Sequence, residues 1–226
     1  MNKMTLKEYI QDHLLEITYE TLYMVGLSAL IAIIFAIIIG SLLYILRKNK
    51  NKVFQIIYKI INIIINIFRS LPFIILIVWL FPFTQSVMKI FTGKEIFIGT
   101  EAAVVPLAVA AIPFFTKLVE NALVEVDDGV VEAATALGFN KFQIMLRVVL
   151  REALPAIISS LTLGIITLIG YTAMAGAVGA GGIGNFADMY GRQNFDQNAS
   201  LFAIVTVIIL VLFVQMIGNL LYKLTK

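Results

Sequence analysis

The chain has 226 residues, of which 60% are hydrophobic and only 14% are charged, and its formal net charge is +3. Soluble domains carry about a quarter charged residues, so the composition excludes an ordinary soluble domain and indicates a chain that lives in lipid. The lack of cysteine excludes disulfides and thiolate chemistry, and His13 is the single histidine. We therefore expect no metal site, no catalytic residue and no nucleic-acid partner.

The first twenty residues mix acids and bases with apolar residues at helical spacing. Leu6, Ile10, Leu14 and Ile17 would share one face of a helix. A cleavable signal peptide would instead place a short apolar stretch directly after a basic start. Residues 1–20 are therefore predicted to form an amphipathic segment outside the membrane.

Five later segments are long and apolar enough to cross a bilayer, which takes about 20 residues. They cover about 21–46, 55–82, 101–121, 153–175 and 197–222. The uncharged stretch after residue 153 exceeds one span, and its second half is rich in glycine, so a helix to about Ala175 and then a non-helical segment are expected. The sequence thus predicts an all-α integral membrane protein with one transmembrane domain over 21–222.

Basic residues gather in three loops that five spans would place on one side. These residues are Arg47, Lys48, Lys50 and Lys52, then Lys141, Arg147 and Arg151, and finally Lys223 and Lys226. Cytoplasmic loops of membrane proteins carry an excess of Lys and Arg. We therefore expect a multi-pass membrane protein with its N-terminus outside and residues 223–226 as a cytoplasmic tail.

The longest hydrophilic stretch, residues 124–152, is predicted to form two short helices in the cytoplasm. Asp127 and Asp128 suit the first turn of the first helix, and Gly138 suits its C-terminal end. Asn140 and Gln143 have the spacing of a capping box for the second helix. Composition alone leaves two interpretations open, a connector that rests on the membrane and a docking element for a soluble partner.

Three motifs carry a resemblance to a known family. The motif Glu132-Ala133-Ala134, followed at fixed spacing by Gly138 and by Val148-Val149-Leu150, resembles the EAA loop of ABC importer permeases. Arg151 stands where that family has proline, and Leu154-Pro155 follows. Residues 69–74 (RSLPFI) and 170–184 (GYTAMAGAVGAGGIG) resemble the methionine-uptake, MetI-like group of these permeases.

The resemblance implies a type I ABC importer transmembrane fold with a cytoplasmic coupling helix, located in a bacterial plasma membrane. It implies a homodimer bound to two ABC ATPase subunits, which bind ATP and Mg, and an extracytoplasmic substrate-binding lipoprotein that delivers methionine. The substrate would be L-methionine, with D-methionine as a further candidate, moved by alternating access. Glu132 would pair with a cation on the ATPase, while Ala133, Ala134 and Gly138 would keep that contact close.

The glycine-rich stretch matches the dinucleotide pattern G-x-G-x-x-G over residues 179–184, but it follows a membrane helix and not a strand. Two interpretations stay open, close helix packing and a gate or wall of the translocation path. The second would assign the path to Tyr171, Met174, Gly176, Gly179 and Gly181. Met174 would either offer a polarisable thioether to a methionine substrate or pack in the helix.

Other charged and proline positions support smaller predictions. Gly93-Lys94 is no phosphate-binding loop because Glu95 follows it, so ATP must be hydrolysed by another chain. Arg69 would reach the membrane interface, pair with a carboxylate or form a gating contact. Pro72 should kink the second span, and Lys117 and Glu120 should pair near the cytoplasmic interface.

Two other functions, a membrane enzyme and a secondary transporter, compete with the importer permease. A membrane enzyme acting on lipid would need a cluster of catalytic side chains at an interface, and the sequence offers none. A secondary transporter would usually show repeated halves with broken helices, which five unpaired spans do not suggest. A permease for another small amino acid or a peptide remains an alternative for the cargo.

Overall fold

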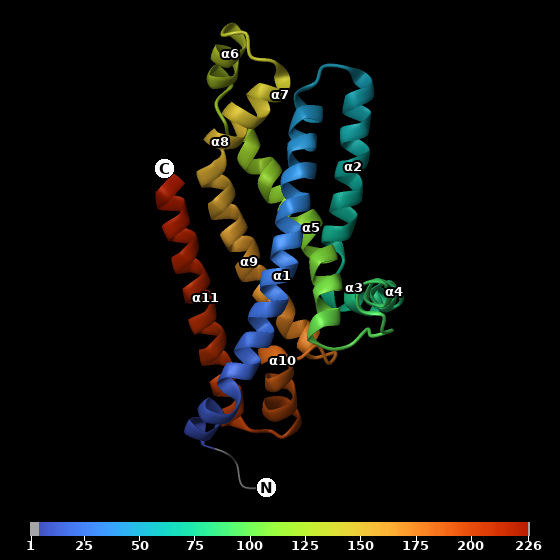
Figure 1. The fold of residues 1–226 in the computed structure, drawn as a ribbon, viewed down its shortest axis with the longest axis vertical. Coiled ribbons are helices and arrows are strands. Elements are labelled where there is room, and N and C mark those ends of the chain that lie inside the picture. Colours follow the sequence, from blue (N-terminus) through green and yellow to red (C-terminus); the bar gives the residue numbers. More distant parts are fainter. Residues whose placement is uncertain (1–4, 226) are drawn as a thin grey trace. The chain divides into compact units, whose positions relative to one another are not determined.

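The computed structural model describes residues 5–225, which form helices joined by short turns with no strand among them. The helices are α1 (Leu6–Lys48), α2 (Lys52–Ser70), α3 (Phe73–Trp79), α4 (Phe81–Thr92), α5 (Thr100–Val124), α6 (Asp128–Ala136), α7 (Lys141–Ile144), α8 (Leu150–Glu152), α9 (Leu154–Gly176), α10 (Gly182–Phe186) and α11 (Gln197–Thr225), with π-helical turns η1 (Met145–Val149) and η2 (Ala187–Gln193). Figure 1 labels the α-helices along the chain.

Five of the described helices are long and apolar enough to cross a membrane, namely α1, α2, α5, α9 and α11. This confirms the predicted fold class. The pair α3 and α4 would add a sixth apolar segment if counted as one span, but the two helices are bent by 58°.

The expected single helix over 55–82 is wrong, because the chain breaks where only a kink was predicted. Helix α2 ends at Ser70, and Pro72 stands immediately before α3. Proline has no N–H to donate and disfavours helical backbone at the residue before it, here Leu71. The Pro72 carbonyl instead accepts from the N–H groups of Ile75 and Leu76, at 3.0 and 3.1 Å, and so starts the new helix.

The expected boundary at residue 20 is also absent, since α1 runs unbroken from Leu6. Residues 1–4 of the predicted amphipathic segment lie outside the described residues. Tyr9 is 2% exposed, and its hydroxyl donates to Asp196 Oδ2 at 3.0 Å. Its ring lies against Phe186 and Phe202. The first turns of α1 therefore pack on other parts of the chain.

Contacts divide the chain into two compact units. The first contains the described residues of Met1–Ile31, together with Leu71–Ala111 and Ile165–Val214. In it α1 caps the short helix α10: Glu20 Oε2 accepts from the N–H of Gly182 at 2.5 Å, and Thr21 Oγ1 accepts from that of Ile183 at 3.0 Å. Gly181 and Gly182 have φ of +88° and +69°, which only glycine adopts readily.

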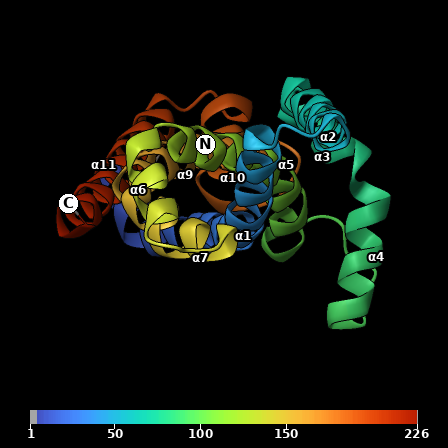
Figure 2. The same cartoon turned by 90° about the horizontal axis from the view of Figure 1, so that it is seen from above.

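Helix α4 in the same unit carries a large exposed apolar surface. Phe83, Ile90 and Phe91 are 51%, 79% and 82% exposed. Seen from above, α4 points away from α3 (Figure 2). The predicted second span ended at residue 82, so it did not include this helix beyond its first two residues.

The second unit contains Ala32–Ser70, Ile112–Gly164 and the described residues of Gln215–Lys226. It holds the end of α1, all of α2, the second half of α5 and the loop helices α6, α7 and α8. Glycines allow close packing here, since a Cβ on Gly164 would meet Phe115 and Leu118 side chains of α5. Helix α7 lies beside the last turns of α1 in both views (Figures 1 and 2).

Candidate functional site

The candidate site is the loop that begins with α6, whose two ends are fixed by local side chains. Asp127 caps its start by accepting a hydrogen bond from the Gly129 N–H at 2.6 Å. Gly138 closes its end in the left-handed region with φ +83°, and the Phe139 N–H donates to the Ala134 carbonyl at 3.2 Å. The predicted acidic start and glycine end of this helix are confirmed.

The second predicted loop helix exists as α7, η1 and α8 in continuous succession. Asn140 and Gln143 form the predicted capping box, with each side chain bonded to the other's backbone N–H. The Ala153 N–H donates to the Val149 carbonyl at 2.9 Å, which carries the helical path on towards α9. This extension fits the presence of Arg151 where the resembled family has a proline.

The four residues predicted to contact an ATPase do not all face the same way. Glu132, Ala133 and Gly138 are exposed, whereas Ala134 is only 5% exposed. Ala134 therefore packs within its own chain, and the exposed apolar surface beside the other three comes from Leu137, which is 78% exposed. Glu132, Ala133 and Ala134 are consecutive positions of α6, and side chains at consecutive helical positions point in different directions.

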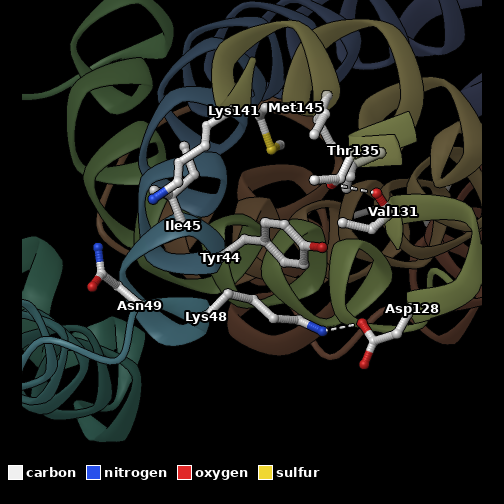
Figure 3. A pocket seen from close by; sticks show the side chains of 11 residues that line it. Tyr44, Ile45, Lys48, Asn49, Asp128, Val131, Thr135, Lys141 and Met145 are labelled. Carbon is white, nitrogen blue, oxygen red and sulfur yellow. Dashed lines mark hydrogen bonds and ion pairs between the residues drawn. The ribbon is translucent and has the colours of Figure 1, made fainter. Parts of the chain in front are cut away.

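A pocket of about 250 Å³ lies on the inner side of the loop, between α6, α7 and the end of α1 (Figure 3). Lys48 of α1 forms an ion pair with Asp128, the first residue of α6. The Lys48 ammonium also lies over the Tyr44 ring, 5.9 Å from its centroid. The ion pair attaches the loop to α1, and sequence reasoning missed it because its two partners are eighty residues apart.

The predicted pair of Lys117 and Glu120 is confirmed, and it belongs to a larger cluster. Lys117 Nζ lies 2.6 Å from Glu120 Oε2, and Glu120 is fully buried. Tyr58 of α2 donates to Glu120 Oε1 at 2.9 Å, and Arg47 Nη1 lies 3.8 Å from the same oxygen. Helical spacing could find the first pair but not the two partners from α2 and α1.

The predicted path residues fall on α9 and on the turn after it. Tyr171 stacks on Phe73, with ring centroids 4.8 Å apart, so the two stretches that carried the family resemblance meet here. Gly176 ends α9 and packs against backbone atoms of Gly184. The turn has positive φ at Gly179 and Gly181. Gly176 therefore has a packing role, and its place in a path stays a prediction.

Arg69 and Pro72 lie at the break between α2 and α3. The exposed Arg69 side chain lies over the Phe114 ring, 6.0 Å from its centroid, and forms no ion pair with any described residue. The expected carboxylate partner is therefore not found in the described chain. Pro72 fixes where the second helix stops, as described above.

Met174 is 46% exposed on α9, two residues before the helix ends. If its thioether contacts a methionine substrate, Met174→Ala should raise the substrate concentration that half-maximally stimulates ATP hydrolysis. We expect a rise of about fourfold to tenfold, because ~0.8–1.4 kcal/mol of apolar contact would be lost. The measurement is a titration of substrate on the assembled complex. An unchanged half-maximal concentration would leave Met174 as a packing residue, and Met189, 46% exposed on η2, provides a matched control.

The chain is similar to known proteins over most of its length. The family model described as "Binding-protein-dependent transport system inner membrane component" matches residues 32–226. The chain is 42% identical over 202 residues to the probable D-methionine transport system permease protein MetI of Pasteurella multocida, covering 89% of this chain and 90% of that protein. It is 42% identical over 158 residues to the D-methionine transport system permease protein MetI of Escherichia coli strain K12, covering 70% of each.

Solved structures agree with this match. An inward-facing conformation of the MetNI methionine ABC transporter aligns with TM-score 0.88 and 38% identity, covering 97% of this chain and 99% of that one. An amino acid ABC transporter aligns with TM-score 0.70 and 17% identity over 99% of both chains, which shows a shared fold alone.

Proposed function

The chain belongs to the family of binding-protein-dependent transport system inner membrane components, and we propose that it is the permease subunit of an ATP-driven methionine importer. The observation that carries the cargo assignment is the likeness, over nearly the whole chain, to the permease of a methionine ABC transporter. L-methionine is the proposed substrate, with D-methionine supported by the names of the relatives. Another small amino acid or a peptide is the alternative.

The proposed partners follow from the likeness of the chain to the permeases of ABC transporters. Two copies of the permease would form the membrane unit, two ABC ATPase subunits would bind its cytoplasmic loops, and an extracytoplasmic substrate-binding lipoprotein would deliver the substrate. ATP and Mg would be bound by the ATPase. In this chain Gly93 is the C-cap of α4, with φ +72°. It therefore ends a helix and does not belong to a phosphate-binding loop.

Helix α6 supplies the proposed contact with the ATPase. Glu132 offers a charge, Leu137 an apolar side chain, and Ala133 and Gly138 a surface that lets another backbone come close. ATP-driven closure of the ATPase dimer would move α6, and the permease would respond only by the difference in affinity between its two conformations. The loop lies on the cytoplasmic side in this proposal, which places the N-terminus outside and the C-terminus inside.

The proposed translocation path runs along the end of α9 and the following turn. Tyr171 and Met174 present side chains there, and Gly179 and Gly181 give the backbone a course that other residues would not follow. Alternating access would open this region to one side of the membrane at a time. The break at Pro72 lies close to this region, because the next residue, Phe73, stacks on Tyr171.

The test is a reconstituted complex of this chain with its co-expressed ATPase and binding protein. Addition of L-methionine should stimulate ATP hydrolysis, and vesicles should accumulate labelled methionine only when ATP is present. D-methionine, other small amino acids and a methionine-containing dipeptide are the comparison ligands. Stimulation by one of these, with no response to methionine, would reassign the cargo. A complex that does not assemble with the ATPase would contradict the permease role itself.

A further inference from the structure

Glu120 is a buried carboxylate that the proposed docking does not use. Its side chain is 0% exposed, on the last turns of α5. It accepts hydrogen bonds from Lys117 Nζ at 2.6 Å and from the Tyr58 hydroxyl at 2.9 Å. Lys117 in turn donates to Asn62 Oδ1 on α2 at 2.9 Å. A carboxylate withdrawn from water needs such partners, but Lys117, on the same helix, could provide the charge alone. The hydrogen bonds from this cluster to Tyr58 and Asn62 of α2 are therefore more than charge compensation requires.

The position of this cluster links it to the coupling loop. Glu120 lies one helical turn before α5 ends at Val124, and α6 begins at Asp128. Two consecutive residues at the end of α1 hold the two sides of this connection. Arg47 Nη1 lies 3.8 Å from Glu120 on α5, and Lys48 pairs with Asp128 on α6. The end of α1 therefore bridges the joint between the membrane helix and the loop helix.

A joint that bends would absorb the motion that an ATPase imposes on α6. The short connection of residues 125–127 is not helical, so the chain can bend there although Asp127 caps the next helix and the Glu125 N–H donates to the Asn121 carbonyl. Tethers on both sides of the joint to one rigid helix end remove that freedom. With Tyr58 and Asn62 added, a displacement of α6 would move α1, α2 and α5 together.

We propose that Glu120, Arg47, Lys48 and Asp128 form a clamp that makes α6 and α5 move as one body, so that these are positioning residues for coupled transport. The proposal rests on the proposed function, since it assumes that α6 receives force from an ATPase. It assigns the clamp no contact with substrate or nucleotide. Its signature is a loss of coupling, in which ATP is hydrolysed without a matching amount of substrate moved.

The test compares import per ATP hydrolysed in the reconstituted complex. Lys48→Asp places two carboxylates side by side and should lower this ratio by about twofold to fivefold, because an exposed ion pair contributes up to about 1 kcal/mol. The swap Lys48→Asp with Asp128→Lys restores an opposite-charge pair and should recover most of the ratio. Lys50→Asp carries the same charge change in the same basic segment without an ion pair among the described residues, and it should couple normally.

Glu120→Gln tests the buried half of the clamp, and it should lower the same ratio while Tyr58→Phe lowers it less. If Glu120→Gln fails to assemble, the exposed pair of Lys48 and Asp128 decides, because surface pairs contribute little to folding. Normal coupling in Lys48→Asp, or no recovery in the swap, would overturn the proposal. Failure of the proposed function looks different, since the unmodified complex would then show no methionine-dependent ATP hydrolysis.

Discussion

Gly138→Trp is expected to abolish methionine-stimulated ATP hydrolysis and uptake while leaving the permease inserted in the membrane. Gly138 is exposed, and a Cβ there would meet no atom of the described chain within 4 Å apart from its two chain neighbours, so a larger side chain would start into open space. What it would obstruct is the close approach of a partner to the end of α6. Uptake into vesicles and stimulated hydrolysis, each normalised to the amount of permease in the membrane, measure the effect.

Two further substitutions separate docking from backbone strain at Gly138. Its φ of +83° disfavours a residue with Cβ by about 1–2 kcal/mol, so Gly138→Ala should loosen the end of α6 slightly. Gly138→Asn tolerates this backbone better and should stay close to the unmodified protein. If the alanine variant loses as much activity as the tryptophan variant, strain explains the result and docking does not.

Glu132→Lys should cause the same loss of methionine-stimulated ATP hydrolysis and uptake, through charge. Glu132 is exposed and forms no ion pair among the residues that the structure describes, so its reversal leaves the fold intact. A lysine there would face the cation expected on the ATPase. Repulsion between these like charges would weaken the binding of the ATPase to α6. Asp127→Asn, which keeps a capping side chain, is the control for charge on the same loop. Normal uptake with Glu132→Lys would contradict the assigned role.

The features that sequence predicted well are those set by neighbouring residues. The Asp127 cap, the Gly138 end and the Asn140 capping box depend on side chains within a few positions of the backbone groups that they satisfy. The five-span count depends on the length of apolar runs, which the bilayer thickness fixes. Lys117 and Glu120 lie three residues apart on one helix, and their pairing follows from that spacing.

The features that sequence missed depend on residues far apart in the chain. Nothing near Lys48 identifies Asp128 as its partner, and nothing near Tyr9 identifies Asp196. The break at Pro72 is a different case, since hydrophobicity stays high on both sides of it and hides the end of α2. The burial of Ala134 depends on the placement of α6 beside α1 and α7, which the residues around Ala134 in the sequence do not show.

Gly176→Ala is expected to lower the thermal stability of the permease, whereas Gly170→Ala should not. A Cβ at Gly176 would overlap backbone atoms of Gly184 and Asn185, and a Cβ at Gly184 would lie 2.5 Å from the Ala173 Cα. Backbone cannot turn aside as a flexible side chain can, so α9 and α10 would have to separate. Overpacking of this kind costs about 1–3 kcal/mol, and a backbone clash belongs at the upper end.

Gly170 is the matched control because it lies on the same helix and a Cβ there would meet nothing within 4 Å. Alanine should even favour the helix at this position by about 0.5–1 kcal/mol. The measurement is the midpoint of thermal unfolding of each variant in detergent, together with its yield from the membrane. Equal unfolding midpoints for Gly176→Ala and Gly170→Ala would contradict the packing role of Gly176. A normal midpoint for Gly176→Ala with lost transport would instead assign this glycine to the path, because a gate fails in function before it fails in folding.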